Sequence, residues 1–177
     1  CILYGTANVE SSECLILEYI NGFSLVDEKE VKKLSIDEKL KIVFEMFISI
    51  NYLHKKFVVR DVNPINFLID HNNTLALIDF NRMYKADECM IDSIDGTYLA
   101  PESSNRREFS TKSDIFSLGK VIQFFMENEL KADRFKKFND IIKQCTQEDP
   151  NKRPTIAQLI NDFYINVFSQ ISGYISE

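Results

Sequence analysis

The chain has 177 residues, of which 45% are hydrophobic and 27% are charged, and its formal net charge is −6. This length and balance fit one globular domain with a proper core. No apolar run reaches the roughly 18 residues of a membrane-spanning helix, and no basic cluster follows a helical face. We therefore expect neither nucleic acid nor a membrane to be the main partner.

Four cysteines are scattered along the chain without metal-ligand spacing: Cys1, Cys14, Cys89 and Cys145. An even number leaves disulfides open, but reduced thiols in a cytoplasmic protein are the simpler interpretation. The chain starts with a cysteine rather than a methionine, and no secretory signal opens it. We expect that Cys1 is not a natural start.

Two short strands are expected first, at residues 2–5 and 14–20, because both segments are apolar. The polar segment 8–13 between them predicts a turn. Asn21-Gly22 then breaks the chain.

A long helix is predicted from Ser35 to His54. Ser35 and Glu38 have the spacing of a capping box, and apolar residues follow at helical spacing. Helical patterns return later in the chain, at residues 114–126, 134–145 and 155–171.

Two further strands are predicted at residues 67–69 and 75–78, on either side of a turn at 71–74. Residues 81–111 are polar and irregular, which is typical of a regulatory loop. Helix dominates the whole pattern, so the predicted fold class is α+β, mainly α.

Three polar residues in the middle of the chain have a functional spacing. Asn66 follows Asp61 by five residues, and Asp79 ends a short apolar run. Phosphoryl transfer from a nucleotide needs one carboxylate at the acceptor hydroxyl, and an amide and a second carboxylate to hold Mg²⁺. Each residue alone is an ordinary turn residue, but the three together favour phosphoryl transfer.

The segments 58–66 and 79–81 resemble the catalytic loop H-R-D-L-x-x-x-N and the metal-binding D-F-G of eukaryotic protein kinases. The resemblance implies that Asp61 is the catalytic base and that Asn66 and Asp79 bind Mg²⁺. It implies ATP as the phosphoryl donor and a protein hydroxyl as the acceptor.

The segment 15–22 resembles the hinge strand that binds adenine in this family. By this resemblance, the carbonyl group of Glu18 and both backbone groups of Ile20 face the purine. Leu17 stands at the gatekeeper position and Leu68 forms the floor of the pocket. The predicted cofactor-binding set consists of Glu18, Ile20, Leu68 and Asp79.

Later segments extend the resemblance to about residue 163. The segment 96–102 is similar to the end of a kinase activation segment, in which Glu102 pairs with Arg153. The segment 114–119 resembles D-x-W-S-x-G, whose aspartate, here Asp114, bonds the backbone of the catalytic loop.

Several positions depart from the family pattern. Val59 replaces a histidine and Asn81 replaces the glycine of D-F-G, where asparagine tolerates a positive φ better than most residues do. Asn63, kept as a candidate catalytic residue, replaces a lysine that contacts the transferred phosphate. Read without gaps, Asp95 and not Thr97 falls at a threonine position of the same network, so either two residues are deleted or the contact is lost. With Asn63, this fits either weakened electrostatic catalysis or a divergent active enzyme.

The family's glycine-rich loop, ATP-anchoring lysine and paired helix glutamate are not found ahead of the hinge. We expect residues 1–20 to be the remnant of the N-terminal lobe and residues 21–177 to be the C-terminal lobe. We also expect no useful catalysis from these 177 residues alone, because nothing in them covers a triphosphate.

Other residues have both an ordinary and a functional interpretation. Arg60 before the predicted base implies docking of a phosphorylated loop, with Ser93 and Thr97 as candidate sites. Plain solvated hydroxyls are the simpler interpretation of both. His54 and His71 are interpreted as a helix-end residue and a turn residue rather than as ligands or bases.

The resemblance therefore implies the large helical lobe of a cytoplasmic serine/threonine kinase that uses ATP and Mg²⁺ and acts on a protein substrate. Pro64 and the segment 98–102 favour the serine/threonine type. One alternative is a pseudokinase, or a truncated lobe, that serves as a binding or scaffold module. Another is a small-molecule phosphotransferase, which leaves Asp114, Arg153 and the segment 100–102 unexplained.

Overall fold

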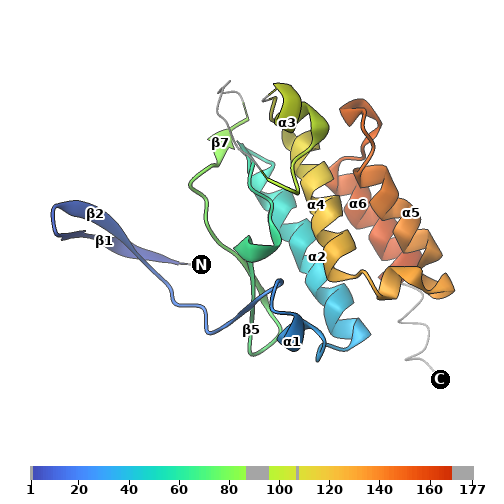
Figure 1. The fold of residues 1–177 in the computed structure, drawn as a ribbon, viewed down its shortest axis with the longest axis horizontal. Coiled ribbons are helices and arrows are strands. Elements are labelled where there is room, and N and C mark those ends of the chain that lie inside the picture. The colour runs from blue at the N-terminus through green and yellow to red at the C-terminus, as the bar shows by residue number, and fades with distance from the viewer. Residues whose placement is uncertain (1, 87–95, 107, 169–177) are drawn as a thin grey trace.

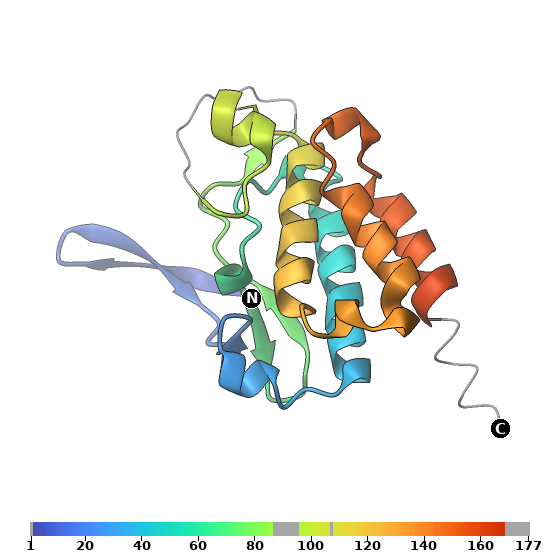
Figure 2. The ribbon, with the colours of Figure 1, turned by 45° about the vertical axis from the view of Figure 1, so that its right-hand side comes forward.

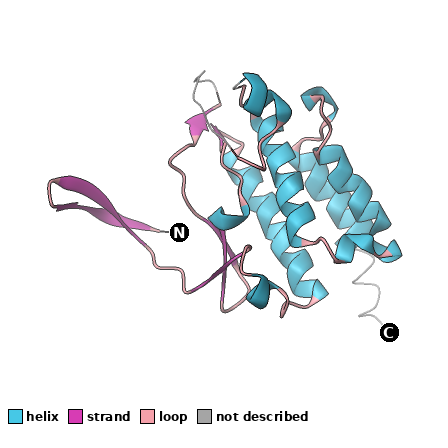
Figure 3. Ribbon diagram, viewed as in Figure 1, coloured by secondary structure: helices cyan, strands magenta, loops and turns pink. Residues whose placement is uncertain are grey.

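The computed structural model describes residues 2–86, 96–106 and 108–168. Helices pack side by side to form the main body, and small sheets lie along one edge of it (Figures 1 and 3). A two-stranded hairpin projects from that edge. The structure confirms a mainly helical α+β fold.

The projecting hairpin consists of β1 (Leu3–Val9) and β2 (Ser12–Leu17), which pair in antiparallel fashion. Its turn holds only Glu10 and Ser11, with φ values of 48° and 71°. Positive φ at both positions is the geometry of tight hairpin turns that follow the strand twist. The predicted turn at 8–13 is therefore too long, because the polar residues on either side of the two-residue turn belong to the strand ladder.

The second sheet has the order β3–β5–β6 and is antiparallel throughout. Its strands are β3 (Gly22–Ser24), β5 (Phe67–Asp70) and β6 (Leu75–Leu77). The structure confirms the strands predicted at 67–69 and 75–78, but β3 was not predicted. Gly22 is required at the start of β3, because a Cβ atom there would lie 2.0 Å from the carbonyl oxygen of Ile69.

The central helix is α2 (Ile36–Leu53), which follows a four-residue helix, α1 (Glu28–Val31). The predicted capping box is present: Ser35 Oγ accepts the N–H group of Glu38, and the Glu38 carboxylate accepts the N–H group of Ser35 at 2.7 Å. One face of α2 is buried between the second sheet and the C-terminal helices (Figure 2).

Three later helices complete the body: α4 (Thr111–Phe125), α5 (Lys136–Cys145) and α6 (Ile156–Phe163). The helix predicted at 114–126 starts three residues earlier, because Ser110 and Ser113 form a capping box of their own. Short 3₁₀ turns, Glu129–Lys131 and Asp133–Phe135, precede α5. A π-helical turn, Tyr164–Phe168, follows α6.

The described part of the segment predicted to be irregular, 81–111, contains two short ordered elements ahead of α4. β7 (Tyr84–Lys85) pairs with β4 (Phe57–Val58), and α3 spans Pro101–Arg106. Both are short and depend on contacts with distant parts of the chain, which a local pattern does not report. Residues 87–95, which include Ser93 and Asp95, lie outside the described part of the chain.

An aromatic cluster joins the helices at the core. The ring of Phe163 on α6 lies edge-on to Phe47 on α2 at 5.5 Å and to Phe138 on α5 at 5.4 Å. All three side chains are fully buried. Edge-to-face contacts of this kind add to the free energy gained from burial alone. They therefore stabilise the packing of α2, α5 and α6 against one another.

Candidate active site

The loop between β4 and β5 holds Asp61 and Asn66 in a fixed relation. A 3₁₀ turn, Pro64–Asn66, ends the loop, and Asn63 caps this turn because its Oδ1 atom accepts the N–H group of Ile65 at 3.2 Å. The side-chain Nδ2 of Asn66 donates to the backbone oxygen of Asp61 at 3.0 Å. This bond leaves Oδ1 of Asn66 available as an oxygen ligand.

Asp79 lies beside Asn66, although thirteen positions separate the two in the sequence. The N–H group of Ile78, which precedes Asp79, donates to the carbonyl oxygen of Asn66 at 2.9 Å. Asp79 adopts a left-handed backbone with φ of 59°, and its Oδ1 accepts the N–H group of Asn81 at 3.3 Å. The sequence suggests that Asn81, which replaces a glycine, adopts a positive φ. In the structure Asp79 is the left-handed residue of this segment instead.

The two residues offer a donor set that suits a hard cation. The second carboxylate oxygen of Asp79 and Oδ1 of Asn66 are oxygen atoms of the type that a hard cation prefers. Mg²⁺ takes few protein ligands and fills its other positions with water and substrate phosphates. Across the described residues, no group of three or more histidine, cysteine or acidic side chains could hold a metal ion. The pair offers oxygen atoms of the kind that Mg²⁺ uses when it binds together with a nucleotide.

A pocket of about 720 Å³ lies between the hairpin and the second sheet. Its lining includes all four residues of the predicted cofactor-binding set: Glu18, Ile20, Leu68 and Asp79. Leu17, predicted as gatekeeper, lines it as well. The volume is in the range of small-molecule sites, and the lining is mainly apolar. The fold therefore brings the residues predicted to bind adenine to one pocket, from three separate segments.

The hinge segment is held by the first residues of the chain. The N–H group of Glu18 donates to the carbonyl oxygen of Ile2 at 2.7 Å, and the Glu18 carboxylate accepts the N–H group of Ile2 at 2.9 Å. The β1–β2 ladder ends at Leu17. Ile20 lies beyond this end, so its backbone groups are not part of the ladder and can meet a ligand in the pocket.

The catalytic loop is fastened to α4 through the buried carboxylate of Asp114. It accepts the N–H groups of Val59 at 2.7 Å and Arg60 at 2.8 Å, as predicted, and lies 3.0 Å from Nε2 of His54. His54 is the C-cap of α2, so its place at the helix end is confirmed, and the contact with Asp114 is additional. A buried carboxylate with three partners holds the loop firmly.

Arg60 adopts a left-handed backbone, with φ of 67°, and its side chain is only 3% exposed. Its guanidinium group lies over the rings of Tyr84 at 4.5 Å and Phe109 at 4.3 Å. Contacts of a cation with two aromatic faces are attractive and restrict its movement. Left-handed non-glycine residues often occur at functional sites, and Arg60 and Asp79 both border this site.

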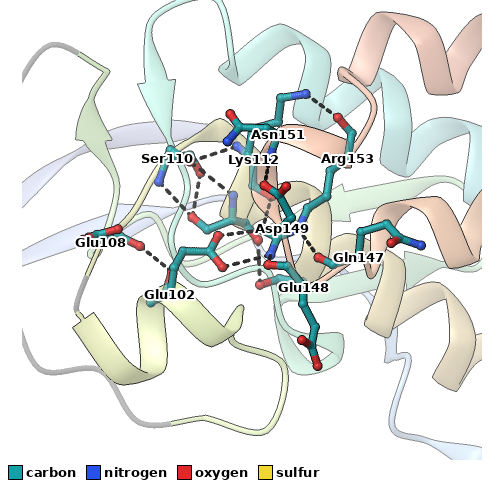
Figure 4. Close-up of polar contacts among 12 residues, drawn as sticks. Glu102, Glu108, Ser110, Lys112, Gln147, Glu148, Asp149, Asn151 and Arg153 are labelled. Carbon is teal, nitrogen blue, oxygen red and sulfur yellow. Dashed lines mark hydrogen bonds and ion pairs between the residues drawn. The ribbon is translucent and has the colours of Figure 1, made fainter.

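Glu102 on α3 and Arg153 form the predicted ion pair. Nη1 and Nη2 of Arg153 lie 2.6 and 2.9 Å from the two carboxylate oxygens of Glu102, and Figure 4 shows the two side chains facing each other. The remaining N–H groups of Arg153 donate to the backbone oxygens of Lys112, Gln147 and Glu148. This contact fastens the end of the segment 96–102 to the helical body.

One charged contact in the site has no counterpart in the predicted motifs. Nε of Arg82 lies 3.8 Å from Oδ2 of Asp61. Arg82 follows Asp79 by three residues and comes close to Asp61 only through the path of the folded chain. No periodicity or motif in the sequence singles it out.

The sequence model of the protein kinase domain matches residues 1–133. The chain belongs to the protein kinase domain family. This membership confirms the resemblance seen in the motifs, and it leaves the small-molecule phosphotransferase interpretation without support. Protein kinases in general use ATP and a divalent metal ion, which agrees with the pocket and the oxygen ligands beside it.

Curated relatives extend the similarity beyond the matched residues. A probable serine/threonine-protein kinase of Dictyostelium discoideum is 26% identical over 90% of this chain and 18% of its own length. Aurora kinase of Schizosaccharomyces pombe is 28% identical over 92% of this chain and 53% of its length. Mitogen-activated protein kinase kinase 1 of Arabidopsis thaliana is 26% identical over 92% and 58%. The chain thus spans less than two thirds of each relative.

None of the helices in the described ranges has both the length and the apolar character needed to cross a bilayer.

Proposed function

We propose that the protein containing this chain transfers the γ-phosphoryl group of ATP to a serine or threonine hydroxyl of a protein substrate. The observation that carries the proposal is the position of Asn66 and Asp79. Asp79 lines the pocket that contains the hinge residues Glu18 and Ile20. Asn66 links Asp79, through the backbone bond to Ile78, with the loop that bears Asp61.

In this proposal the acceptor hydroxyl lies against the carboxylate of Asp61, which orients it and takes its proton. The hydroxyl oxygen forms a bond to the γ-phosphorus while the bond from that phosphorus to the β,γ-bridging oxygen breaks. The electron pair of the broken bond leaves with ADP. Asn66 and Asp79 would hold Mg²⁺, which neutralises charge on the phosphates.

The adenine ring would bind between the hinge and the second sheet. The carbonyl group of Glu18 and the backbone groups of Ile20 would pair with its edge, and Leu68 would support its face. The backbone can serve this purpose because Ile20 lies outside the strand ladder. In this proposal residues 1–20 belong to the N-terminal lobe and residues 21–177 form the C-terminal lobe.

The serine/threonine assignment is supported by the names of the relatives, of which several are serine/threonine-protein kinases. It also agrees with Pro64 in the catalytic loop. A protein substrate, ATP as co-substrate and a cytoplasmic location without nucleic-acid or membrane partners all belong to this proposal.

A second candidate function is a binding or scaffold module without catalysis. Two observations favour it. Asn63 is neutral, and its oxygen is used to cap a 3₁₀ turn. The charged side chains among the described residues that line the pocket are Glu18 and Asp79, both of them carboxylates. Such a module would bind a nucleotide or a partner and would show no turnover.

Phosphoryl transfer from radiolabelled ATP to a generic protein acceptor separates the two functions. The full-length protein should label the acceptor, and D61N should lower the rate by at least about 100-fold. D140N is a matched control, because Asp140 lies exposed on α5 and pairs only with Lys143 in the described contacts. Acid hydrolysis of the product should release phosphoserine or phosphothreonine. Equal labelling by wild type and D61N would contradict the proposed mechanism.

A further inference from the structure

A cation stands next to the residue proposed as the base. Nε of Arg82 lies 3.8 Å from Oδ2 of Asp61, and their side chains are 47% and 25% exposed. An exposed ion pair of this kind contributes little to folding stability. Its position is more informative than its strength, because the acceptor hydroxyl must approach this same carboxylate.

The backbone directs Arg82 to this place. The N–H group of Met83 donates to the carbonyl oxygen of Phe80 at 3.1 Å, so Asn81 and Arg82 form the centre of a turn. The turn begins directly after Asp79, at one side of the nucleotide pocket. At its other end, Tyr84 pairs with Val58 just ahead of the catalytic loop. The backbone therefore places Arg82 next to Asn81, which lines the pocket, and close to Asp61.

The site needs a positive charge at this boundary. During transfer, negative charge spreads over the oxygens of the phosphoryl group, and stabilising it is most of the catalysis. Within the catalytic loop, Asn63 is neutral and its oxygen is engaged. Arg60 is buried between two aromatic rings, so its guanidinium group is not open to solvent. Arg82, half exposed beside Asp61, can reach a bound phosphate.

We propose that Arg82 is a catalytic residue that binds the non-bridging oxygens of the phosphoryl group as it moves to the acceptor hydroxyl held by Asp61. This inference rests on the proposed kinase function. Arg82 forms and breaks no covalent bond and keeps its protons throughout. Before ATP binds, its contact with Asp61 keeps the guanidinium group near its working position.

The test uses the full-length protein and compares wild type with R82Q, R82K and R82A. R82Q should lower kcat about 100-fold, as expected for loss of one donor to transition-state charge, and leave the KM for ATP unchanged. R82K should recover part of the rate. Guanidinium ion at millimolar concentration should accelerate R82A and not wild type, a rescue that a purely structural role would not give.

Two controls keep the outcomes distinct. R134Q removes an exposed arginine from the 3₁₀ turn before α5 and should leave kcat unchanged. Thermal unfolding of each variant shows whether the fold is intact. Full kcat in R82Q, or no rescue of R82A by guanidinium, would overturn the role of Arg82 while D61N still loses activity. If wild type and D61N are equally inactive, the proposed function itself fails, and the role of Arg82 with it.

Discussion

Breaking the ion pair between Glu102 and Arg153 should destabilise the fold severely. The side chain of Arg153 is 0% exposed and that of Glu102 is 11% exposed. All five N–H groups of the guanidinium have a bond: two reach Glu102, and three reach backbone oxygens. The ring of Phe116 lies 4.9 Å from the centre of the guanidinium. Almost no water can replace a missing partner.

The magnitude follows from this burial. E102Q leaves a buried cation without its counter-charge, and R153M removes the donors that Arg153 supplies to the Glu102 carboxylate and to three backbone oxygens. Removing one partner of a buried pair costs about 3–5 kcal/mol. For a domain of this size, a change of about 1 kcal/mol lowers Tm by about 2–4 °C. Each single variant should therefore lower Tm by roughly 6–20 °C.

Denaturant unfolding followed by circular dichroism measures the free energy of unfolding. The double variant E102Q/R153M should lose less than the sum of the two single variants, because neither charge is then left alone. K131Q is the control: its ion pair with Glu127 is exposed at both ends, 68% and 70%, and should be worth less than about 1 kcal/mol. Single variants that lose no more than K131Q would refute the reasoning.

Two further predictions concern packing and the burial of a thiol. G22A should lower the free energy of unfolding by about 1–3 kcal/mol, because its Cβ would lie 2.0 Å from the oxygen of Ile69; G96A, with 3.7 Å of room, should change little in the same denaturant melt. Burial raises the pKa of Cys145 to about 12, so at pH 8 a thiol reagent should label half-buried Cys14 and leave Cys145 unlabelled until unfolding. Equal labelling of Cys14 and Cys145 at pH 8 would contradict this burial. The unfolded thiol has a pKa near 9, so the contribution of Cys145 to the free energy of unfolding should be complete below pH 9 and disappear as the pH approaches 12.

Local signals in the sequence predicted the helices well. The Ser35–Glu38 capping box marks the start of α2 because a cap is made by residues three positions apart and needs no distant partner. The start of α4 was missed, although Ser110 also caps its helix, because Ser113 is not the acidic or amide residue usually found at that position. Three-residue β3 and two-residue β7 could not be predicted, since only their pairing with distant strands makes them strands.

The residues of the candidate site that belong to sequence motifs could be predicted. Asp61, Asn66 and Asp79 stand at a recognisable spacing. The fold places Asp79 in the pocket of the hinge residues and bonds Asn66 to the neighbouring Ile78. Arg82 was not predictable, because its nearness to Asp61 depends on a turn of the folded chain. The contact between His54 and Asp114 was not predictable for the same reason, because it joins two residues that are 60 positions apart in the sequence.

The most direct test of the account is ATP binding by the full-length protein, measured by calorimetry with and without Mg²⁺, in wild type and D79N. We expect that Mg²⁺ strengthens ATP binding to wild type and that D79N loses most of this effect, since the carboxylate of Asp79 lines the pocket and is the proposed oxygen ligand. Adenosine, which has no phosphates, should bind both proteins equally. If ATP does not bind, or if Mg²⁺ strengthens binding to D79N as much as to wild type, the assignment of this pocket is wrong.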